Sequence, residues 1–254
     1  MEKIKVQNRE LELYSDIKEL PIARYHAFQR MCLLDAGLGS DLSAVDNHLG
    51  RIKAFLISDE KEKALTEIEN LRTNFWFMQS GISPALMSFA VLVYKLDGKI
   101  KGDLTDDGIK KTCEEISFLT AGQIEKTTSE IKKKIETDLA RYFPAFFDTA
   151  DKKIIADLIR KKTLLRCKQL QGEEVSKELS EIEKKILTFF APESFTGNDN
   201  AEIRFEKDFE KLCVYLSQEL NADVSHKTVF EFFSAYEFVK KQKDTEKKQL
   251  QKWK

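Results

Sequence analysis

The amino-acid sequence predicts an all-α protein, a multi-helix bundle with a small N-terminal β-hairpin and a C-terminal helical extension. Apolar residues recur with a period near 3.6 from Pro21 onward, which is typical of amphipathic helices. The 254 residues include only 10 Gly and 4 Pro, so few turns are expected. The 42 basic residues nearly cancel the 43 acidic ones, so no overall field attracts nucleic acid or an anionic membrane.

The first residues alternate between charged and apolar side chains, as a strand pair does. Ile4 and Val6 share one side, Leu11 and Leu13 share another, and a polar turn over residues 7–10 separates them. The pattern predicts a β-hairpin whose open edges offer strand addition. We therefore include Ile4 and Val6 among the candidate residues of a partner interface.

Three amphipathic helices follow the hairpin. The first begins at Pro21 and ends at Gly37, the second begins near Ser40, and the third runs from Asp59 to Gly81. The apolar stripes of the second and third helices, which we expect to be buried, are Leu42, Val45, Leu49, Ile52 and Phe55, and Ala64, Ile68, Leu71, Phe75 and Met78.

A fourth helix begins with Ser83 and Pro84 and is apolar almost all round up to Leu96. Such a helix has to be surrounded, so we place it at the centre of a bundle against which the other helices lay their apolar stripes. A loop follows, and a fifth helix runs from Thr105 to Leu119. Residues 1–120 are therefore expected to form one domain, the hairpin plus a five-helix bundle.

Residues 121–254 are expected to form a second helical region. Its first helix, from Gln123 to Tyr142, has only a narrow apolar seam, which suits a long helix that connects two bodies or lies on a surface. Further helices cover 149–171 and the stretch that follows. Capping-box patterns at Asp199 with Glu202 and at Thr228 with Glu231 begin the last two.

The last helix carries more aromatic side chains than one face accommodates. They are either core residues that pack in a second direction or part of a contact with a neighbouring chain. Trp253, close to the end, suggests that the tail docks somewhere. The candidate interface residues in this region are Phe230, Phe232, Phe233, Phe238 and Trp253.

Residues 240–254 form a basic tail in which seven lysines outnumber Asp244 and Glu246. Such a tail either grips a nucleic-acid backbone or is the solvated end of the last helix. The lysines are Lys240, Lys241, Lys243, Lys247, Lys248, Lys252 and Lys254.

The sequence contains one near-motif for a metal. Residues 103–114 resemble a calcium-binding loop, with Asp103 first, Gly108 sixth and Glu114 twelfth. Thr105 at the third position and Lys110 at the normally apolar eighth position argue against calcium, whereas Thr105 is a good helix N-cap. We predict no metal and no cofactor here.

No spacing of residues predicts a catalytic site. His26 and His48 lack the acidic neighbours of a metal-binding helix, and His226 forms only a lone loop pair with Asp223. We interpret all three histidines as structural or solvated. The cysteines Cys32, Cys113, Cys167 and Cys213 lie far apart in helical stretches, which is typical of reduced core thiols. We therefore predict a protein that is not an enzyme.

Four segments resemble helical virion proteins of tailed bacteriophages, especially the crAss-like phages. They are Glu19-Leu20-Pro21-Ile22-Ala23-Arg24-Tyr25, Asp35-Ala36-Gly37-Leu38-Gly39-Ser40-Asp41, Glu69-Asn70-Leu71-Arg72 and Leu96-Asp97-Gly98. The resemblance covers mainly residues 15–120. It implies a portal-proximal neck or tail protein, located in the virion and, during assembly, in the host cytoplasm. It transfers no functional residues to this chain.

Two functions follow as expectations. The first is a non-enzymatic structural assembly protein, a ring-forming subunit that contacts copies of itself and other virion proteins. The second is a packaged or regulatory helical protein that binds DNA through the basic tail. Contacts between apolar side chains persist in high salt, whereas phosphate contacts weaken, so the two differ in salt dependence. Neither involves a membrane.

Overall fold

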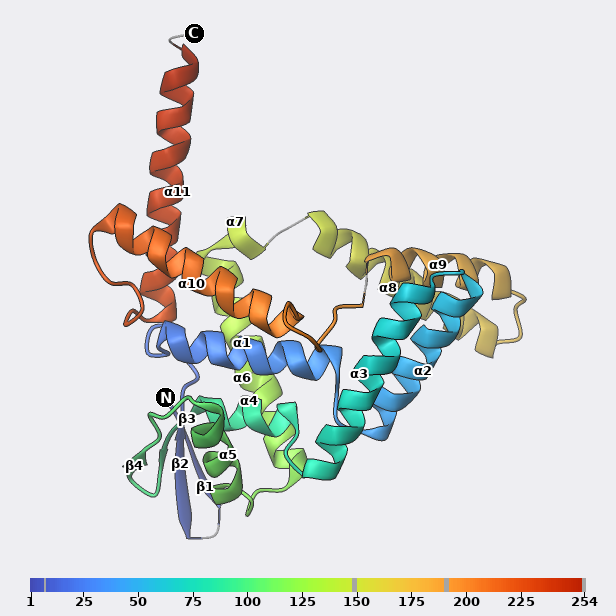
Figure 1. Ribbon diagram of the computed structural model, residues 1–254, viewed down its shortest axis with the longest axis horizontal. Coiled ribbons are helices and arrows are strands. Elements are labelled where there is room, and N and C mark those ends of the chain that lie inside the picture. The colour runs from blue at the N-terminus through green and yellow to red at the C-terminus, as the bar shows by residue number, and fades with distance from the viewer. Residues whose placement is uncertain (7, 148–149, 190–191, 253–254) are drawn as a thin grey trace.

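The computed structural model describes the chain except for residues 7, 148–149, 190–191 and 253–254. The described part is 70% helical, with eleven helices and one four-stranded antiparallel sheet (Figure 1). The predicted fold class is confirmed, including the N-terminal hairpin.

The sheet contains two strands beyond the predicted hairpin. The hairpin strands β1 (Glu2–Val6) and β2 (Arg9–Leu13) pair with Ile4 opposite Leu11, and β3 (Val93–Leu96) and β4 (Lys99–Ile100) extend the sheet in the order β1-β2-β3-β4. Strand β2 is therefore paired on both sides, by β1 and β3, whereas β1 lies at an edge of the sheet.

The helix predicted to continue to Leu96 ends at Leu92. The chain becomes extended at Val93, and Asp97 and Gly98 both have positive φ, 50° and 78°, as a two-residue hairpin turn between β3 and β4 requires. The buried guanidinium of Arg24 also holds this break, because it donates hydrogen bonds to the carbonyls of Val91 at 2.5 Å and Val93 at 3.1 Å.

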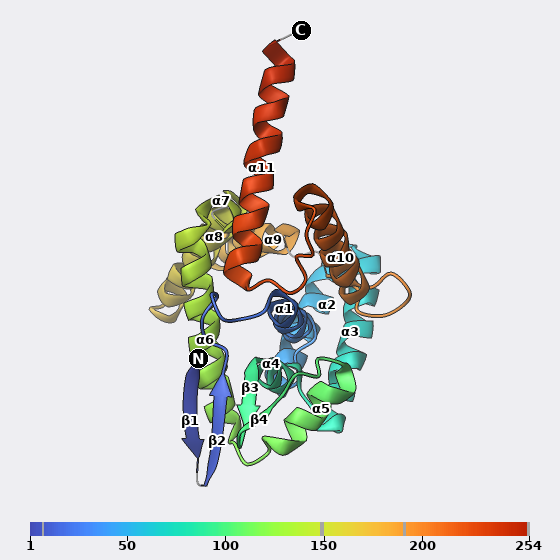
Figure 2. The same ribbon diagram turned by 90° about the vertical axis from the view of Figure 1, so that its left-hand side faces the viewer.

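Four helices form the main body around the sheet. They are α1 (Ile22–Gly37), α4 (Pro84–Leu92), α5 (Asp106–Glu115) and α6 (Ala121–Tyr142). Helix α4 packs against α1, α5 and α6, so its predicted central position is confirmed (Figure 2). The fifth helix ends at Glu115, earlier than the predicted Leu119.

Helix α6 lies on the surface of this body and buries its seam. The narrow apolar seam that the sequence predicts consists of Ile124, Ile131, Ile135 and Leu139, and all four are buried. Its capping box comes from Thr120 and Gln123, whose side chains exchange hydrogen bonds with the backbone of each other's position.

The C-terminal region shares the core of the N-terminal region. It comprises α7 (Pro144–Phe147), α8 (Ala150–Leu170), α9 (Ser176–Phe189), α10 (Ala201–Leu220) and α11 (Val229–Lys252). One apolar cluster includes both Leu20 and Phe232, and the Val229 amide donates to the Leu20 carbonyl at 2.9 Å. The core is therefore continuous across the predicted division at residue 120.

The caps of the last two helices agree only in part with the prediction. Asn200 caps α10 by accepting from the Ile203 amide, in place of the predicted Asp199. Thr228 and Glu231 form the predicted capping box of α11. Beyond the body, the C-terminal part of α11 extends away from the rest of the molecule in both views (Figures 1 and 2).

Two helical hairpins lie at the end of the molecule away from the sheet and α11, on the right in Figure 1. One consists of α2 (Leu42–Ile57) and α3 (Lys61–Ser80), the other of α8 and α9. Within the described residues, no single helix is long and apolar enough to span a membrane; α3 and α4 meet that test only as a pair bent by 64°.

His26 joins α1 to α10. Its ring stacks on Phe209, with centroids 3.9 Å apart, and its Nε2 lies 2.9 Å from Glu206 Oε2. Burial lowers the pKa of His26, and the hydrogen bond to Glu206 offsets part of this. The folded protein therefore binds a proton at His26 less readily than the unfolded chain does.

This environment predicts a loss of stability in mild acid. The unfolded chain takes up the proton first as the pH falls below about 6.5, so the free energy of unfolding should fall from that pH downward. Replacing His26→Gln should flatten the slope, measured by urea unfolding between pH 5 and 7.5. The exposed His226→Gln is the control, and an equal slope in His26→Gln and the wild type would contradict the assignment.

Candidate functional site

Helix α3 buries polar side chains and exposes apolar ones. Glu67, Asn70 and Asn74 are at most 2% exposed, whereas the predicted core residues Ile68 and Phe75 are 44% and 45% exposed. The prediction that α2 and α3 lay their apolar stripes on the central helix is therefore wrong for these residues. The hairpin packs through a polar seam instead.

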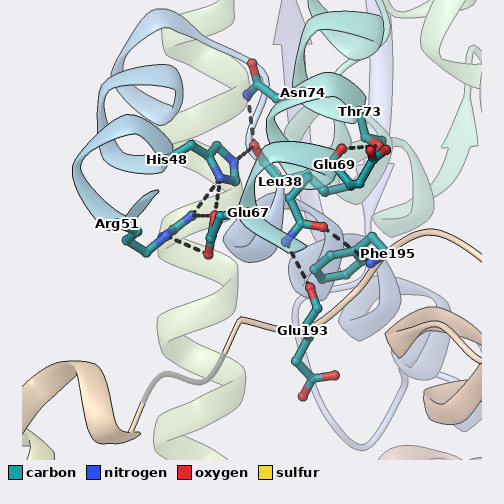
Figure 3. A network of polar contacts seen from close by, with 10 residues as sticks. Leu38, His48, Arg51, Glu67, Glu69, Thr73, Asn74, Glu193 and Phe195 are labelled. Atoms are coloured by element: carbon teal, nitrogen blue, oxygen red, sulfur yellow. Dashed lines mark hydrogen bonds and ion pairs between the residues drawn. The ribbon is translucent and has the colours of Figure 1, made fainter. Parts of the chain in front are cut away.

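The Glu67 carboxylate is the centre of this seam (Figure 3). Its Oε2 lies 2.5 Å from His48 Nδ1, and its Oε1 lies 2.9 Å from Arg51 Nε. His48 Nε2 donates to the Leu38 carbonyl at 2.9 Å, since a carbonyl oxygen can only accept. Both ring nitrogens of His48 are thus occupied, so the ring is held as part of the packing.

The loop between α1 and α2 contributes a backbone acceptor to the seam. The Leu38 carbonyl accepts a second hydrogen bond, from Asn74 Nδ2 at 2.8 Å. Gly39 follows with φ +62°, and a Cβ there would lie 2.3 Å from the Ala44 Cβ, so only glycine fits. This glycine positions the carbonyl on which His48 and Asn74 converge.

Asn70 attaches the hairpin to the segment before α10. Its Nδ2 donates to the Glu193 carbonyl at 2.9 Å, and the Phe195 amide donates to its Oδ1 at 3.4 Å (Figure 3). The Phe195 ring packs on Gly37, where a Cβ would lie 2.2 Å from the ring. The seam therefore connects three separate parts of the chain.

A cleft of about 850 Å³ lies between the start of α2, the start of α4 and the α5–α6 connection. His48, Arg51 and Cys113 border it. Burial raises the pKa of the Cys113 thiol to about 12, so this thiol stays protonated and is a poor nucleophile at neutral pH. The histidine and arginine of the cleft are engaged with Glu67.

The apolar side chains of the hairpin form an exposed surface, which we call the outer face. Each is 44–72% exposed. Soluble monomers rarely expose a large contiguous apolar patch, so this surface is the candidate site for a contact with another molecule. The outer face consists of Leu42, Leu49, Leu56, Ile57, Leu65, Ile68, Phe75 and Trp76.

The structure places three of the four candidate phenylalanines of the last helix against the same chain. Phe232 is 2% exposed and belongs to the core, and Phe230 and Phe233 pack partly buried against it beside Phe143. Of the two alternatives, these three rings follow packing in a second direction within the chain, because α6, α7 and α10 supply further surfaces for them. Phe238 is 62% exposed.

The other candidate interface residues differ in exposure. Ile4 and Val6 are partly buried against the chain's own core. In the basic tail, Lys247 and Lys248 are exposed, Lys241 pairs with Glu237 at 3.0 Å, and Lys243 pairs with Glu219 at 2.9 Å.

The remaining tail residues add one contact. Lys240 Nζ lies 4.9 Å from the centre of the Phe146 ring. The side chain of Lys252, together with Trp253 and Lys254, lies outside the described residues.

The loop that resembles a calcium site is a helix cap. Thr105 Oγ1 accepts from the Gly108 amide, and the Asp103 carboxylate accepts from the amide and hydroxyl of Thr105. The same two Thr105 hydrogen bonds lower the pKa of Asp103. Among the described residues no cluster of three or more His, Cys, Asp or Glu side chains is placed to hold a metal ion.

The four cysteines are free, but they are not all core residues. Cys113 is buried, Cys32 and Cys213 are half-buried, and Cys167 is exposed. The prediction of core thiols is therefore wrong for Cys167, because the α8–α9 hairpin that carries it packs mostly on itself.

The polar seam differs from the predicted apolar stripe, although the sequence contains a signal for it. Glu67, Asn70 and Asn74 are three and four residues apart, the same helical spacing as the apolar stripe. Both the polar stripe and the apolar stripe of α3 are candidates for its buried side. Hydrophobicity alone favours the apolar stripe, which is the exposed one. His48 and Arg51, one turn apart on α2, complete the pattern.

Replacing Glu67→Leu should lower the free energy of unfolding by about 3–5 kcal/mol, because it leaves His48 and Arg51 without their partner. The exposed Glu69→Leu on the same helix is the control and should change it by less than about 0.5 kcal/mol. Replacing His48→Leu, Arg51→Met and Glu67→Leu together should cost less than Glu67→Leu alone. Urea unfolding measures all three, and equal effects of the two glutamate variants would contradict the role of the seam.

Comparisons with protein families, curated proteins and solved structures gave no match to this chain.

Proposed function

We propose that this chain is a non-enzymatic structural assembly protein that binds copies of itself and other subunits. The observation that carries the proposal is the outer face, eight large apolar side chains exposed on one helical hairpin. Leaving this surface in water is unfavourable, and covering it with another protein removes that cost. The polar seam on the opposite side keeps the hairpin from turning this surface inward.

The resemblance to helical virion proteins of crAss-like phages favours one form of this function. In that form the chain is a ring-forming subunit of a neck or tail, close to the portal. The molecule offers a suitable shape, since two helical hairpins lie at one end and the free part of α11 extends from the body (Figure 1). The exposed edge of β1 is a further place for a neighbouring subunit.

DNA binding through the basic tail is the second candidate, and the projection of α11 favours it. Lys247 and Lys248 are exposed on a helix that stands clear of the body (Figure 2). Three other tail lysines already contact Glu237, Glu219 or Phe146, which reduces the charge free to meet phosphates.

Light scattering of the full chain should give a mass of several chains, and that mass should persist when salt rises from 50 to 500 mM, because apolar contacts do not depend on counterions. Electron microscopy should then show closed particles of uniform size. A single-chain mass at millimolar concentration, with no association with other virion proteins, would rule out the assembly function.

A truncation that removes residues 240–254 separates the two candidates. It leaves Val229, Phe232 and Val239 in the core, whereas deletion from Thr228 would open the core. If the tail binds DNA through about four phosphates, affinity should fall roughly a hundredfold between 50 and 200 mM salt, and the truncation should abolish binding. The assembly function predicts an unchanged mass for the truncated chain. Fluorescence anisotropy with duplex DNA and light scattering measure the two results.

A further inference from the structure

We propose that the outer face binds a second copy of this chain, with the two α2 helices antiparallel about a two-fold axis that passes between Leu49 and Gly50. This inference rests on the proposed function and names the partner of the outer face. It concerns a contact between identical surfaces, in which the symmetry generates each residue pair twice.

The exposed apolar stripes of α2 and α3 lie on the same side of the hairpin. On α2, Leu42, Leu49 and Leu56 are seven residues apart, two helical turns, and so share one face. Each helix also has a second stripe, which faces the other helix of the hairpin. Going around the helix axis in the direction of increasing residue number, the exposed stripe lies about 120° beyond that facing stripe on both helices. Because the two helices are antiparallel, equal rotations bring both stripes to one side.

The area of the outer face suits a stable dimer. Taking roughly 150–250 Å², the range for aromatic side chains, as a guide, eight large apolar side chains at about half exposure present on the order of 600–1,000 Å². A standard interface takes about 800 Å² from each partner. The spacing of Leu42, Val45, Leu49, Ile52 and Leu56, alternating three and four residues, is typical of a helix–helix seam.

When two copies of α2 lie antiparallel, residues of complementary type come to the same level along the pair. An antiparallel pairing centred between Leu49 and Gly50 places Leu42 opposite Ile57 of the second copy and Leu49 opposite its Gly50. It also places Asp46 opposite Lys53, and the two-fold axis generates this pair twice. The match of apolar with apolar and acid with base is what selects a second copy as the partner.

Asp46 and Lys53 have no ion-pair partner in the described part of the chain, although both are exposed beside the apolar stripe. In the proposed dimer each finds an opposite charge. Two charges that flank an apolar contact contribute mainly to its register and specificity.

Gly50 supports the same axis. Glycine inside a helix costs roughly 1 kcal/mol relative to alanine. A Cβ at Gly50 would meet nothing within 4 Å, so the fold of one chain does not require glycine there. Close approach of another backbone does, and Gly50 lies four residues from Asp46 and three from Lys53, on the side of α2 where these charges of the two copies meet.

The exposed apolar side chains of α8 do not form such a face. On α8, Ile154, Ile159, Leu164 and Leu170 are all exposed. At 100° per residue they point to different sides of the helix, so they make no continuous stripe. The regular stripe of the α2–α3 hairpin is therefore the surface suited to a helical partner.

Charge reversal in the full chain tests the register, with sedimentation equilibrium as the measurement. Asp46→Lys places two ammonium groups opposite each other, and Lys53→Asp does the same with two carboxylates, so each variant should raise the dissociation constant about tenfold or more. The chain with both substitutions should recover wild-type affinity. An equimolar mixture of the two single variants should form mixed dimers of near-wild-type affinity. Asp208→Lys, an exposed reversal on α10, is the matched control and should have no effect.

Gly50→Leu tests the close approach without weakening the monomer, since leucine favours a helix. It should raise the dissociation constant at least tenfold while circular dichroism and urea unfolding show an intact fold. Gly122→Leu on α6, which also has open space around it, should leave association unchanged.

The outcomes separate this inference from the proposed function. If the chain assembles but neither charge reversal nor Gly50→Leu changes the dissociation constant, the two-fold contact is wrong and the assembly function stands. If the single variants weaken association and the double variant does not restore it, the register is also wrong. A chain that stays monomeric and joins no larger particle overturns both.

Discussion

The Glu67 carboxylate determines how the α2–α3 hairpin is oriented. It holds His48 and Arg51 from the neighbouring helix at 2.5 and 2.9 Å, and His48 in turn holds the Leu38 carbonyl. A buried charge without its partners costs several kcal/mol, so any rotation that separated these groups would be penalised. The hairpin must therefore keep its polar side inward, and its apolar side remains exposed.

Apolar periodicity predicted where the helices lie but not which side of each helix is buried. For α6 the seam Ile124, Ile131, Ile135 and Leu139 is buried as expected, because most of the rest of that helix consists of charged and small polar side chains. On α3 a second stripe of Glu67, Asn70 and Asn74 has the same period. Asn74 finds its hydrogen-bond partner at Leu38, and Asn70 finds partners at Glu193 and Phe195. Glu67 pairs with His48 and Arg51 of the neighbouring helix, and no local pattern reveals any of these partners.

The missed strands have a similar cause. Residues 93–96 continue the apolar run of α4, and such a run is equally typical of a buried helix or a buried strand. Contacts with two segments that are distant in the sequence favour the strand. Residues of β2 pair with β3, and Arg24 on α1 takes the carbonyls of Val91 and Val93 that an uninterrupted helix would have used itself. The Asp97-Gly98 turn was the local sign of this hairpin.

The polar and the apolar side of the α2–α3 hairpin have different roles in the proposed assembly. Polar contacts are directional, so the Glu67 seam fixes the orientation of the hairpin while adding little net stability. Apolar contact is non-directional and scales with area, so the outer face supplies affinity. Such a face alone accepts many registers. In the proposed dimer Asp46, Lys53 and Gly50 restrict the register, because only one antiparallel alignment of α2 pairs both charges and leaves the two glycines between them.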